Sequence, residues 1–217
     1  METPLTVLYT HNLRGDLDVL PRLYAFLRQL KAYYSSEEVV QVCALDPAQP
    51  PGRTLLLDLG ENCVPDVWHC QVSDGRSTLV VLDGMGYEAA RVDDAAGKAA
   101  KMGAGVRMAL VDEAHPFALE DALIMARIPL ESSPNLLKIC LFPAEKTHFD
   151  DNTLFLAKLS GSQQVGAAQL THLIGGWTLT AHEIHDLPRR TLPDPTIAAA
   201  VEFVVSEAKY AQKRRSS

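Results

Sequence analysis

The chain has 217 residues, of which 47% are hydrophobic and 22% charged, an ordinary globular composition that suits one sizeable domain. Its formal net charge of -7 argues against a nucleic-acid surface, which needs a basic stripe. The sequence has no apolar run near the roughly 20 residues of a membrane-spanning helix, and no signal segment is visible at its start. We therefore expect neither a nucleic-acid nor a membrane partner, a cytoplasmic location, and four cysteines present as reduced thiols.

The first element is a short apolar run at residues 5–10, which ends in polar residues before Gly15. This pattern predicts a buried strand that delivers functional residues to the edge of a sheet. A helical pattern follows at residues 19–31, with Pro21 in its first turn and leucines along one face. Residues 53–59 predict a second buried strand, which ends at Gly60 and Glu61.

The remaining elements alternate between short strands and helices. Strands are predicted at residues 39–42, 106–111, 122–128, 136–142, 153–159 and 178–184, and helices at 79–85 and 99–102. A last helix is predicted to begin with Asp194 as its cap and Pro195 at its first position. We expect residues 1–208 to form a single domain and residues 209–217 a frayed basic tail.

Two of these strand ends resemble the metal-binding segments of the calcineurin-like metallophosphoesterases, in particular the 5'-nucleotidase branch. In that family the first strand ends in T-N-D-x-H-G, whose Asp and His bind metal. Asn12 and Arg14 occupy those two places here. The family's second strand ends in Gly-Asp, whose Asp bridges two metal ions, and Glu61 stands there in this chain.

Two further segments extend the resemblance. Residues 86–92 resemble a G-Y-D-A segment that leads into G-N-H-E, where this chain has Asp94 for the Asn and Ala95 for the catalytic His. The family's G-H-x-H motif corresponds to residues 145–148, with Lys146 in place of the first His and His148 retained. The resemblance covers residues 5–95 and 153–205. It implies an α/β/β/α sandwich of two mixed β-sheets flanked by helices.

These replacements imply a dismantled metal centre. Two unit charges 4 Å apart interact by about 4 kcal/mol at an effective dielectric constant of 20, so Arg14 would oppose a nearby dication by about twice that. We hypothesise that Arg14 and Lys146 take the place of the metal cations in a buried ion cluster with Glu61 and Asp94. An ordinary surface salt bridge of Arg14 with Asp16 or Asp18 is the alternative.

The function expected from the resemblance is that of a degenerate, non-catalytic domain without a cofactor. It would bind a protein partner, a second copy of itself, or an anionic small molecule held by Arg14. One alternative is a residual phosphoesterase with a manganese, zinc or magnesium ion on Glu61, Asp94 and His148. Another is a structural subunit of a larger assembly.

Other candidate residues support simpler interpretations. Cys63, His69 and Cys70 are close enough in sequence to suggest a metal site, but their spacing fits no standard zinc pattern. His182 and His185 would face opposite sides of a strand and are interpreted as exposed hairpin residues. Asp58 is expected to be structural.

Overall fold

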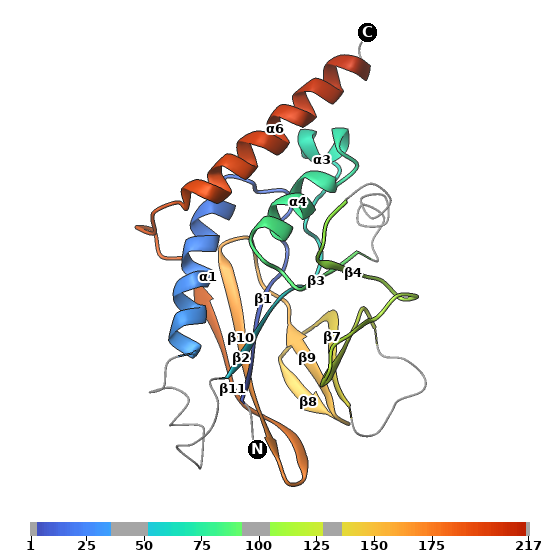
Figure 1. Cartoon of the computed structure of the whole chain (residues 1–217), viewed down its shortest axis with the longest axis vertical. Coiled ribbons are helices and arrows are strands. Elements are labelled where there is room, and N and C mark those ends of the chain that lie inside the picture. The colour runs from blue at the N-terminus through green and yellow to red at the C-terminus, as the bar shows by residue number, and fades with distance from the viewer. Residues whose placement is uncertain (1–3, 36–51, 93–104, 128–135, 216–217) are drawn as a thin grey trace.

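A computed structural model describes residues 4–35, 52–92, 105–127 and 136–215 of the chain (Figure 1). Within these residues the strands form two mixed sheets. The six-stranded sheet has the order β11-β10-β1-β2-β3-β4, and the five-stranded sheet the order β5-β6-β7-β9-β8. The predicted strand at 39–42, the predicted helix at 99–102 and Asp94 lie outside the described residues.

The six-stranded sheet is parallel at its centre and antiparallel on one side. Its strands are β1 (Leu5–Thr10), β2 (Arg53–Asp58), β3 (Ala89–Arg91), β4 (Ala109–Val111), β10 (Gln164–Leu173) and β11 (Gly176–Asp186). Strands β1 to β4 pair in parallel, and β10 pairs antiparallel with both β1 and β11. The carboxyl ends of β1, β2 and β3 therefore meet at one edge of the sheet, where side chains from different segments can form a site.

The five-stranded sheet packs against one face of the first. Its strands are β5 (Phe117–Ala118), β6 (Ala122–Met125), β7 (Leu137–Ala144), β8 (His148–Asp150) and β9 (Thr153–Ala157). Alternate residues of β1 and β2 explain the packing, because successive side chains of a strand point to opposite faces. Val7 and Leu57 belong to the core between the sheets, whereas Leu8 and Leu56 belong to the core beneath the helices.

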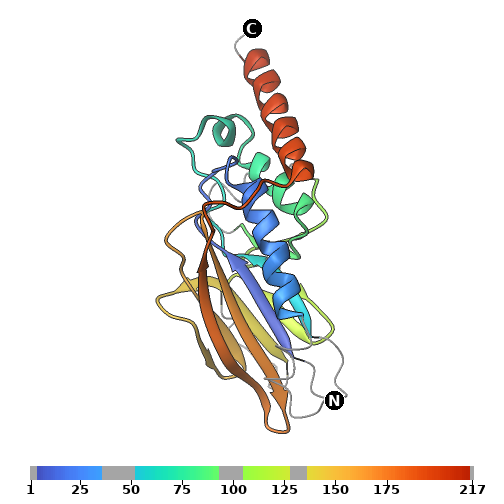
Figure 2. The same cartoon turned by 90° about the vertical axis from the view of Figure 1, so that its left-hand side faces the viewer.

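Helices lie on the other face of the six-stranded sheet: Figure 2 shows α1 along the strands, whereas α6 packs on α1, α3 and α4 and extends away from the sheet. They are α1 (Leu20–Tyr34), α3 (Trp68–Val72), α4 (Arg76–Gly84) and α6 (Pro195–Arg215). The expected leucine face of α1 is confirmed, since Leu20, Leu23 and Leu27 are buried. The sequence prediction of two mixed sheets flanked by helices is therefore confirmed.

Helix α6 starts where the sequence predicted but ends later. Asp194 Oδ1 accepts hydrogen bonds from the amides of Thr196 (2.9 Å) and Ile197 (3.2 Å), which confirms the expected cap. The expectation of a frayed tail from residue 209 is wrong, because α6 continues to Arg215. The buried side chains of Val204 and Ala208 pack against the rest of the protein, and the last turns of α6 continue the helix beyond them. No helix in the described parts of the chain is long and apolar enough to cross a membrane.

Candidate functional site

The loops after β1 and β2 run side by side beyond the carboxyl edge of the six-stranded sheet. Backbone hydrogen bonds continue the parallel pairing into these loops. The amide of Asn12 donates to the carbonyl of Gly60 at 3.1 Å, and the amide of Arg14 donates to the carbonyl of Glu61 at 2.8 Å. The three residues that the sequence singled out at the two strand ends are thus brought together by the backbone itself.

The same three residues have strained backbones. Asn12, Arg14 and Glu61 have φ values of 60°, 53° and 55°, in the left-handed region that side chains other than glycine rarely adopt. Each such residue costs about 1 kcal/mol or more, and residues of this kind cluster at binding and catalytic sites. The concentration of three of them at one sheet edge supports a functional role for this edge.

His11 presents a buried nitrogen without a partner at this edge. Its side chain is 6% exposed, and its Nδ1 lies 3.3 Å from the amide and 3.2 Å from the carbonyl oxygen of Leu159. Its Nε2 is buried and has no hydrogen-bond partner. Burial lowers the pKa of His11, which favours the neutral ring. Leaving such a group unpaired costs about 1–3 kcal/mol, so a ligand that reached Nε2 would remove this penalty.

Asn12 carries a second unpaired atom. Its Nδ2 donates to the carbonyl of Ser160 at 3.2 Å, but its Oδ1 is buried and has no hydrogen-bond partner. The loop between β9 and β10 also reaches the β1 loop through Ser162, whose Oγ donates to Asp16 at 2.8 Å. Three loops therefore meet here, and they leave unpaired atoms on two consecutive residues.

A buried hydrogen-bond network supports the edge from below. Asp58 accepts hydrogen bonds from Thr10 Oγ1 (2.8 Å), the Gly60 amide (2.9 Å) and Asn62 Nδ2 (2.6 Å). Tyr87 reaches the same hydroxyl of Thr10 at 3.0 Å. Burial raises the pKa of Asp58 to about 6 despite these bonds. Its role in bracing both strand ends agrees with the structural role expected from the sequence.

Two further arginine side chains, those of Arg91 and Arg127, lie near this edge on the side of the five-stranded sheet. Arg91, at the end of β3, is 6% exposed and donates from Nε to the carbonyl of Leu59 at 2.6 Å. Its guanidinium lies 5.3 Å from the ring centre of Phe142, and that of Arg127 lies 4.9 Å from the same ring. Together with Arg14 they place cationic side chains at the ends of three different strands.

The hypothesis of a buried ion cluster is wrong for the residues that can be checked. Arg14, Glu61 and Lys146 are all exposed, and no ion pair joins Arg14 to Glu61. The alternative pairing of Arg14 with Asp16 or Asp18 is also absent from the described residues. Arg14 therefore projects from the backbone of the edge as an exposed cation, and Asp94 lies outside the described residues.

His148 is held in a different setting. It lies in edge strand β8, where its ring stacks on Phe155 with centroids 4.5 Å apart and its Nδ1 contacts the carbonyl of Lys146 at 3.0 Å. Among the described residues no hydrogen bond or ion pair joins it to Asn12 or Glu61. The structure thus brings Asn12, Arg14 and Glu61 together, but not His148 with them.

The donor set at this edge does not fit a pair of divalent metal ions. Within the described ranges, the one group of three His, Cys, Asp or Glu with ligand atoms all within 4.8 Å of one another lies elsewhere, at Cys63, His69 and Cys70. Among the described residues that were expected at this centre, Glu61 offers the one carboxylate, and its backbone is bonded to that of the cationic Arg14. Two dications need several carboxylates to offset their mutual repulsion.

Cys63 and Cys70 correct a further expectation. They form a disulfide between the loop after β2 and helix α3, so the prediction of four reduced thiols is wrong for these two residues. Cys140 is buried and lies outside this disulfide. The two hairpin histidines lie on opposite faces of β11, as predicted, since His182 contacts Tyr9 and His185 contacts Tyr34. The expectation that they are exposed is wrong, because these contacts leave both of them half-buried.

Two residues of this edge were missed by the sequence analysis. His11 directly precedes Asn12, and its position at the end of a buried strand was the available signal. Arg91 ends the otherwise apolar strand β3, and an arginine in such a run is a signal of a buried guanidinium with a specific partner.

Comparisons with known proteins find a likeness among solved structures. No family model and no curated protein matches the sequence. Among solved structures, the chain is similar to the calcineurin-like phosphoesterase YfkN from Bacillus subtilis, with 12% sequence identity and a TM-score of 0.47. That match covers 98% of this chain and 100% of the other.

Proposed function

We propose that this chain is a non-catalytic, 5'-nucleotidase-like domain of the calcineurin-like phosphoesterase superfamily that binds an anionic small molecule. We place the binding site at the carboxyl edge of the six-stranded sheet, at His11, Asn12 and Arg14, with the exposed carboxylate of Glu61 on the neighbouring loop. The superfamily assignment rests on the motif pattern of the strand ends. The binding role rests on the chemistry that these residues offer.

One observation carries the proposal: a single strained loop carries the exposed side chain of Arg14 and two unpaired buried atoms, His11 Nε2 and Asn12 Oδ1. A guanidinium recognises phosphate and carboxylate oxygens through charge-assisted hydrogen bonds. The neutral ring of His11 supplies a donor when its Nδ1 accepts the amide of Leu159. Asn12 Oδ1 accepts a hydrogen bond from a hydroxyl group. A phosphate monoester with a free hydroxyl supplies partners for all three.

The residual-phosphoesterase alternative has weaker support. It needs Glu61, Asp94 and His148 on one ion, and His148 is stacked on Phe155 in an edge strand. Glu61 keeps a free carboxylate at the edge, so this alternative is retained as an outcome of the test below.

Binding is tested by titration calorimetry of the metal-free protein with inorganic phosphate and with adenosine monophosphate. We expect Arg14→Gln to weaken binding by about tenfold or more, the value of one charged hydrogen bond. Arg107→Gln is the matched control, because Arg107 is an exposed arginine that precedes the amino end of β4, at the opposite sheet edge. No binding of either anion, or equal loss in both variants, would overturn the proposed site.

Catalysis is tested separately by elemental analysis and by hydrolysis of p-nitrophenyl phosphate with added manganese, zinc or magnesium. We expect no turnover above that of the metal alone. Turnover that is lost in Glu61→Gln would replace our proposal with the phosphoesterase alternative.

The other expectations from the sequence remain part of the proposal. These are a single domain, a cytoplasmic location, and a protein partner or self-association. Light scattering of the purified chain tests self-association, and fractionation of the source cells tests location.

A further inference from the structure

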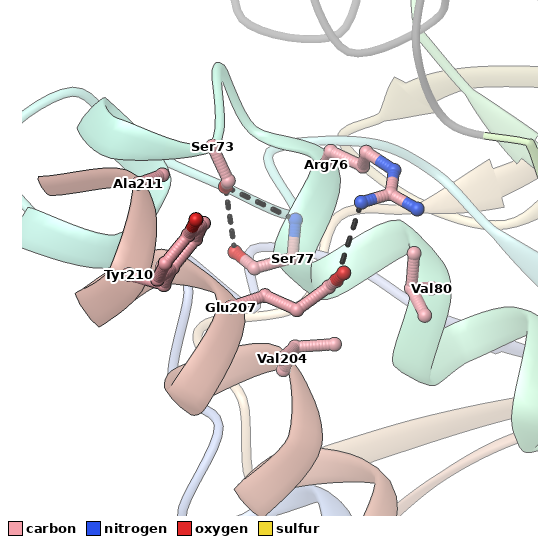
Figure 3. A pocket seen from close by; sticks show the side chains of 9 residues that line it. Ser73, Arg76, Ser77, Val80, Val204, Glu207, Tyr210 and Ala211 are labelled. Carbon is pink, nitrogen blue, oxygen red and sulfur yellow. Dashed lines mark hydrogen bonds and ion pairs between the residues drawn. The ribbon is translucent and has the colours of Figure 1, made fainter. Parts of the chain in front are cut away.

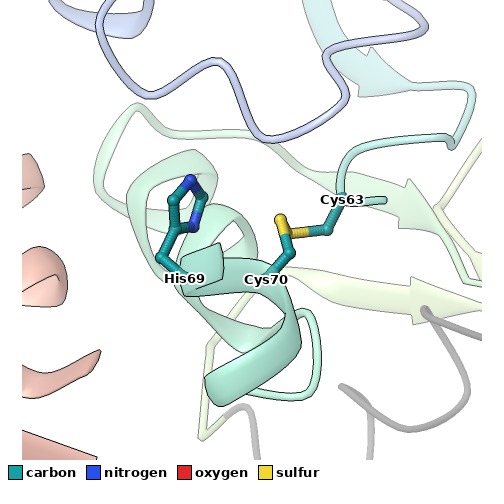
Figure 4. A group of neighbouring side chains, drawn as sticks. All are labelled: Cys63, His69 and Cys70. Atoms are coloured by element: carbon teal, nitrogen blue, oxygen red, sulfur yellow. A yellow bond between two sulfur atoms is a disulfide. The ribbon is translucent and has the colours of Figure 1, made fainter. Parts of the chain in front are cut away.

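Cys63, His69 and Cys70 form a buried cluster close to the β1 loop. Figure 4 shows the three side chains next to one another, with Cys63 in the loop after β2 and the other two on α3. Their exposed fractions are 5%, 5% and 3%, and their ligand atoms all lie within 4.8 Å of one another. Two sulfur atoms and an imidazole nitrogen make up a donor set that zinc-class cations prefer.

The hydrogen bonds of His69 fix its protonation. Its Nε2 lies 2.9 Å from the carbonyl oxygen of Gly15, which can only accept, so Nε2 carries the proton. Its Nδ1 then has a lone pair, and it accepts a hydrogen bond from Ser77 Oγ at 2.8 Å. A ring held by a backbone carbonyl at one nitrogen, with a lone pair at the other, is the arrangement of metal-binding histidines.

The surroundings of the sulfur atoms suit thiolates. Thr78 Oγ1 lies 3.2 Å from Cys63 Sγ, where its hydroxyl can donate to a thiolate. Ser77 Oγ accepts a hydrogen bond from Ser73 Oγ at 3.1 Å, so Ser77 keeps a partner if it releases His69 Nδ1. Replacement of the Ser77 hydroxyl by a cation would therefore leave Ser77 Oγ its hydrogen bond from Ser73, while the Ser77 proton would have to turn to another acceptor, of which Cys63 Sγ at 3.9 Å is one.

A cavity of about 250 Å³ lies next to Ser77, the residue that contacts His69. Figure 3 shows the side chains of α4 and α6 that line it. Ser73 and Ser77 line it, and Ser77 is the residue that contacts His69 Nδ1. A metal site needs an entry path, and a cation that entered from this cavity would have to pass Ser77, because none of the three cluster residues lines it.

We propose that Cys63, Cys70 and His69 Nδ1 form a binding site for a zinc-class cation when the disulfide is reduced. A dithiol reductant opens the disulfide by thiol–disulfide exchange, so that it becomes a disulfide itself and both cysteines become thiols. Binding of Zn²⁺ then releases the two thiol protons to solvent. In a tetrahedral zinc site the ligand atoms lie about 3.3–3.8 Å apart, so small side-chain movements suffice from the present positions.

The site also supports the loop that carries Arg14. A Cβ on Gly15 would lie 2.6 Å from Cys70 Sγ and 3.2 Å from His69 Cε1, so this glycine packs directly against the cluster. Either the disulfide or a bound cation would hold Cys63 and Cys70 together beneath the loop. The inference does not depend on the anion site, because none of its three ligands belongs to that site.

The experiment compares oxidised and reduced wild-type protein, which requires no substitution. Each form is incubated with Zn²⁺, freed of excess metal, and analysed for bound zinc by elemental analysis. We expect about one zinc per reduced chain and none per oxidised chain. Bound zinc should also protect Cys63 and Cys70 from alkylation, which peptide mass spectrometry measures at each cysteine. Equal zinc content in both forms, or no zinc in the reduced form, would overturn the proposal.

Variants then identify the ligands. Cys63→Ser and His69→Ala should each weaken zinc affinity by about tenfold or more in competition with a chromogenic chelator. Cys140→Ser is the matched control, since Cys140 is the buried cysteine of β7 outside the cluster. Glu61→Gln and Arg14→Gln should leave zinc binding unchanged, which separates this site from the edge site. Zinc binding that is lost in Glu61→Gln and kept in Cys63→Ser would contradict the assignment.

Discussion

Asp58 and Thr10, which end two neighbouring parallel strands, are joined by a hydrogen bond of 2.8 Å from Thr10 Oγ1 to Asp58 Oδ2. Both side chains have no exposed surface. Asp58 thus couples the ends of β1 and β2 at the base of the candidate site, and its ionisation affects the stability of the whole edge.

Substitution of Asp58 should change the dependence of stability on pH. Burial raises the pKa of Asp58 from 3.8 to about 6, so its contribution to stability is fully present below pH 3.8 and is lost as the pH rises through about 6. The unfolding free energy should therefore differ by at most about 3 kcal/mol between a pH below 3.8 and a pH above about 6. Asp58→Asn keeps an acceptor for Gly60 and Asn62 and should abolish this pH dependence, as measured by urea unfolding between pH 4 and 8. Identical pH profiles in both proteins would contradict the raised pKa.

Gly60 should tolerate no side chain. Its φ is 99°, and a Cβ there would lie 2.8 Å from Arg91 Nη2 and 3.0 Å from its Nε. Gly60→Ala should therefore lower the unfolding free energy by about 2–4 kcal/mol, from backbone strain and displacement of the guanidinium. Gly86→Ala is the matched control, because Gly86 has a φ of 82° but nothing within 4 Å of its Cβ position. Equal losses of unfolding free energy in the two variants, measured by chemical denaturation, would show that displacement of the Arg91 guanidinium does not destabilise the protein.

Glycine substitutions at the left-handed positions of the sheet edge should have different effects on stability and on anion binding. Arg14→Gly removes a side chain from a left-handed position, so the unfolding free energy should be unchanged or higher by up to about 1 kcal/mol. The same variant should lose anion binding. Glu61→Gly relieves a similar strain at a φ of 55° but should retain the anion, since it removes a negative charge. Calorimetric titration and thermal unfolding of both variants test this, and a clear loss of stability in Arg14→Gly would refute it.

Helix α6 provides a packing prediction with an adjacent control. Val204 is 3% exposed and packs in the core beneath the helices, whereas its neighbour Phe203 is 56% exposed. Val204→Ala should lower the unfolding free energy by about 1–2 kcal/mol, because it removes buried methyl groups. Phe203→Ala should change it by about 0.5 kcal/mol or less. A larger loss of unfolding free energy in Phe203→Ala than in Val204→Ala, measured by urea unfolding, would show that the other face of α6 packs against the rest of the protein.

Local sequence patterns were sufficient to predict much of the fold. The strand at residues 5–10 and the second strand end at Gly60 were predictable because a buried strand needs a continuous apolar run that stops at polar residues. The start of α6 was predictable because Asp194 and Pro195 act on the first turn alone. Its end was not, because the burial of Val204 and Ala208 against other helices stabilises turns that have little apolar pattern of their own.

The candidate site, like the fold, could be predicted from the sequence only in part. The motif resemblance in the sequence was sufficient to group Asn12, Arg14 and Glu61, and the parallel pairing of β1 and β2 brings their strand ends to one sheet edge. Only the tertiary structure decided that His11 Nε2 is unpaired, that Arg91 lies under Gly60, and that Cys63 bonds to Cys70 beside His69. Those facts depend on contacts between side chains from separate segments, and such contacts leave no periodic signal in the sequence.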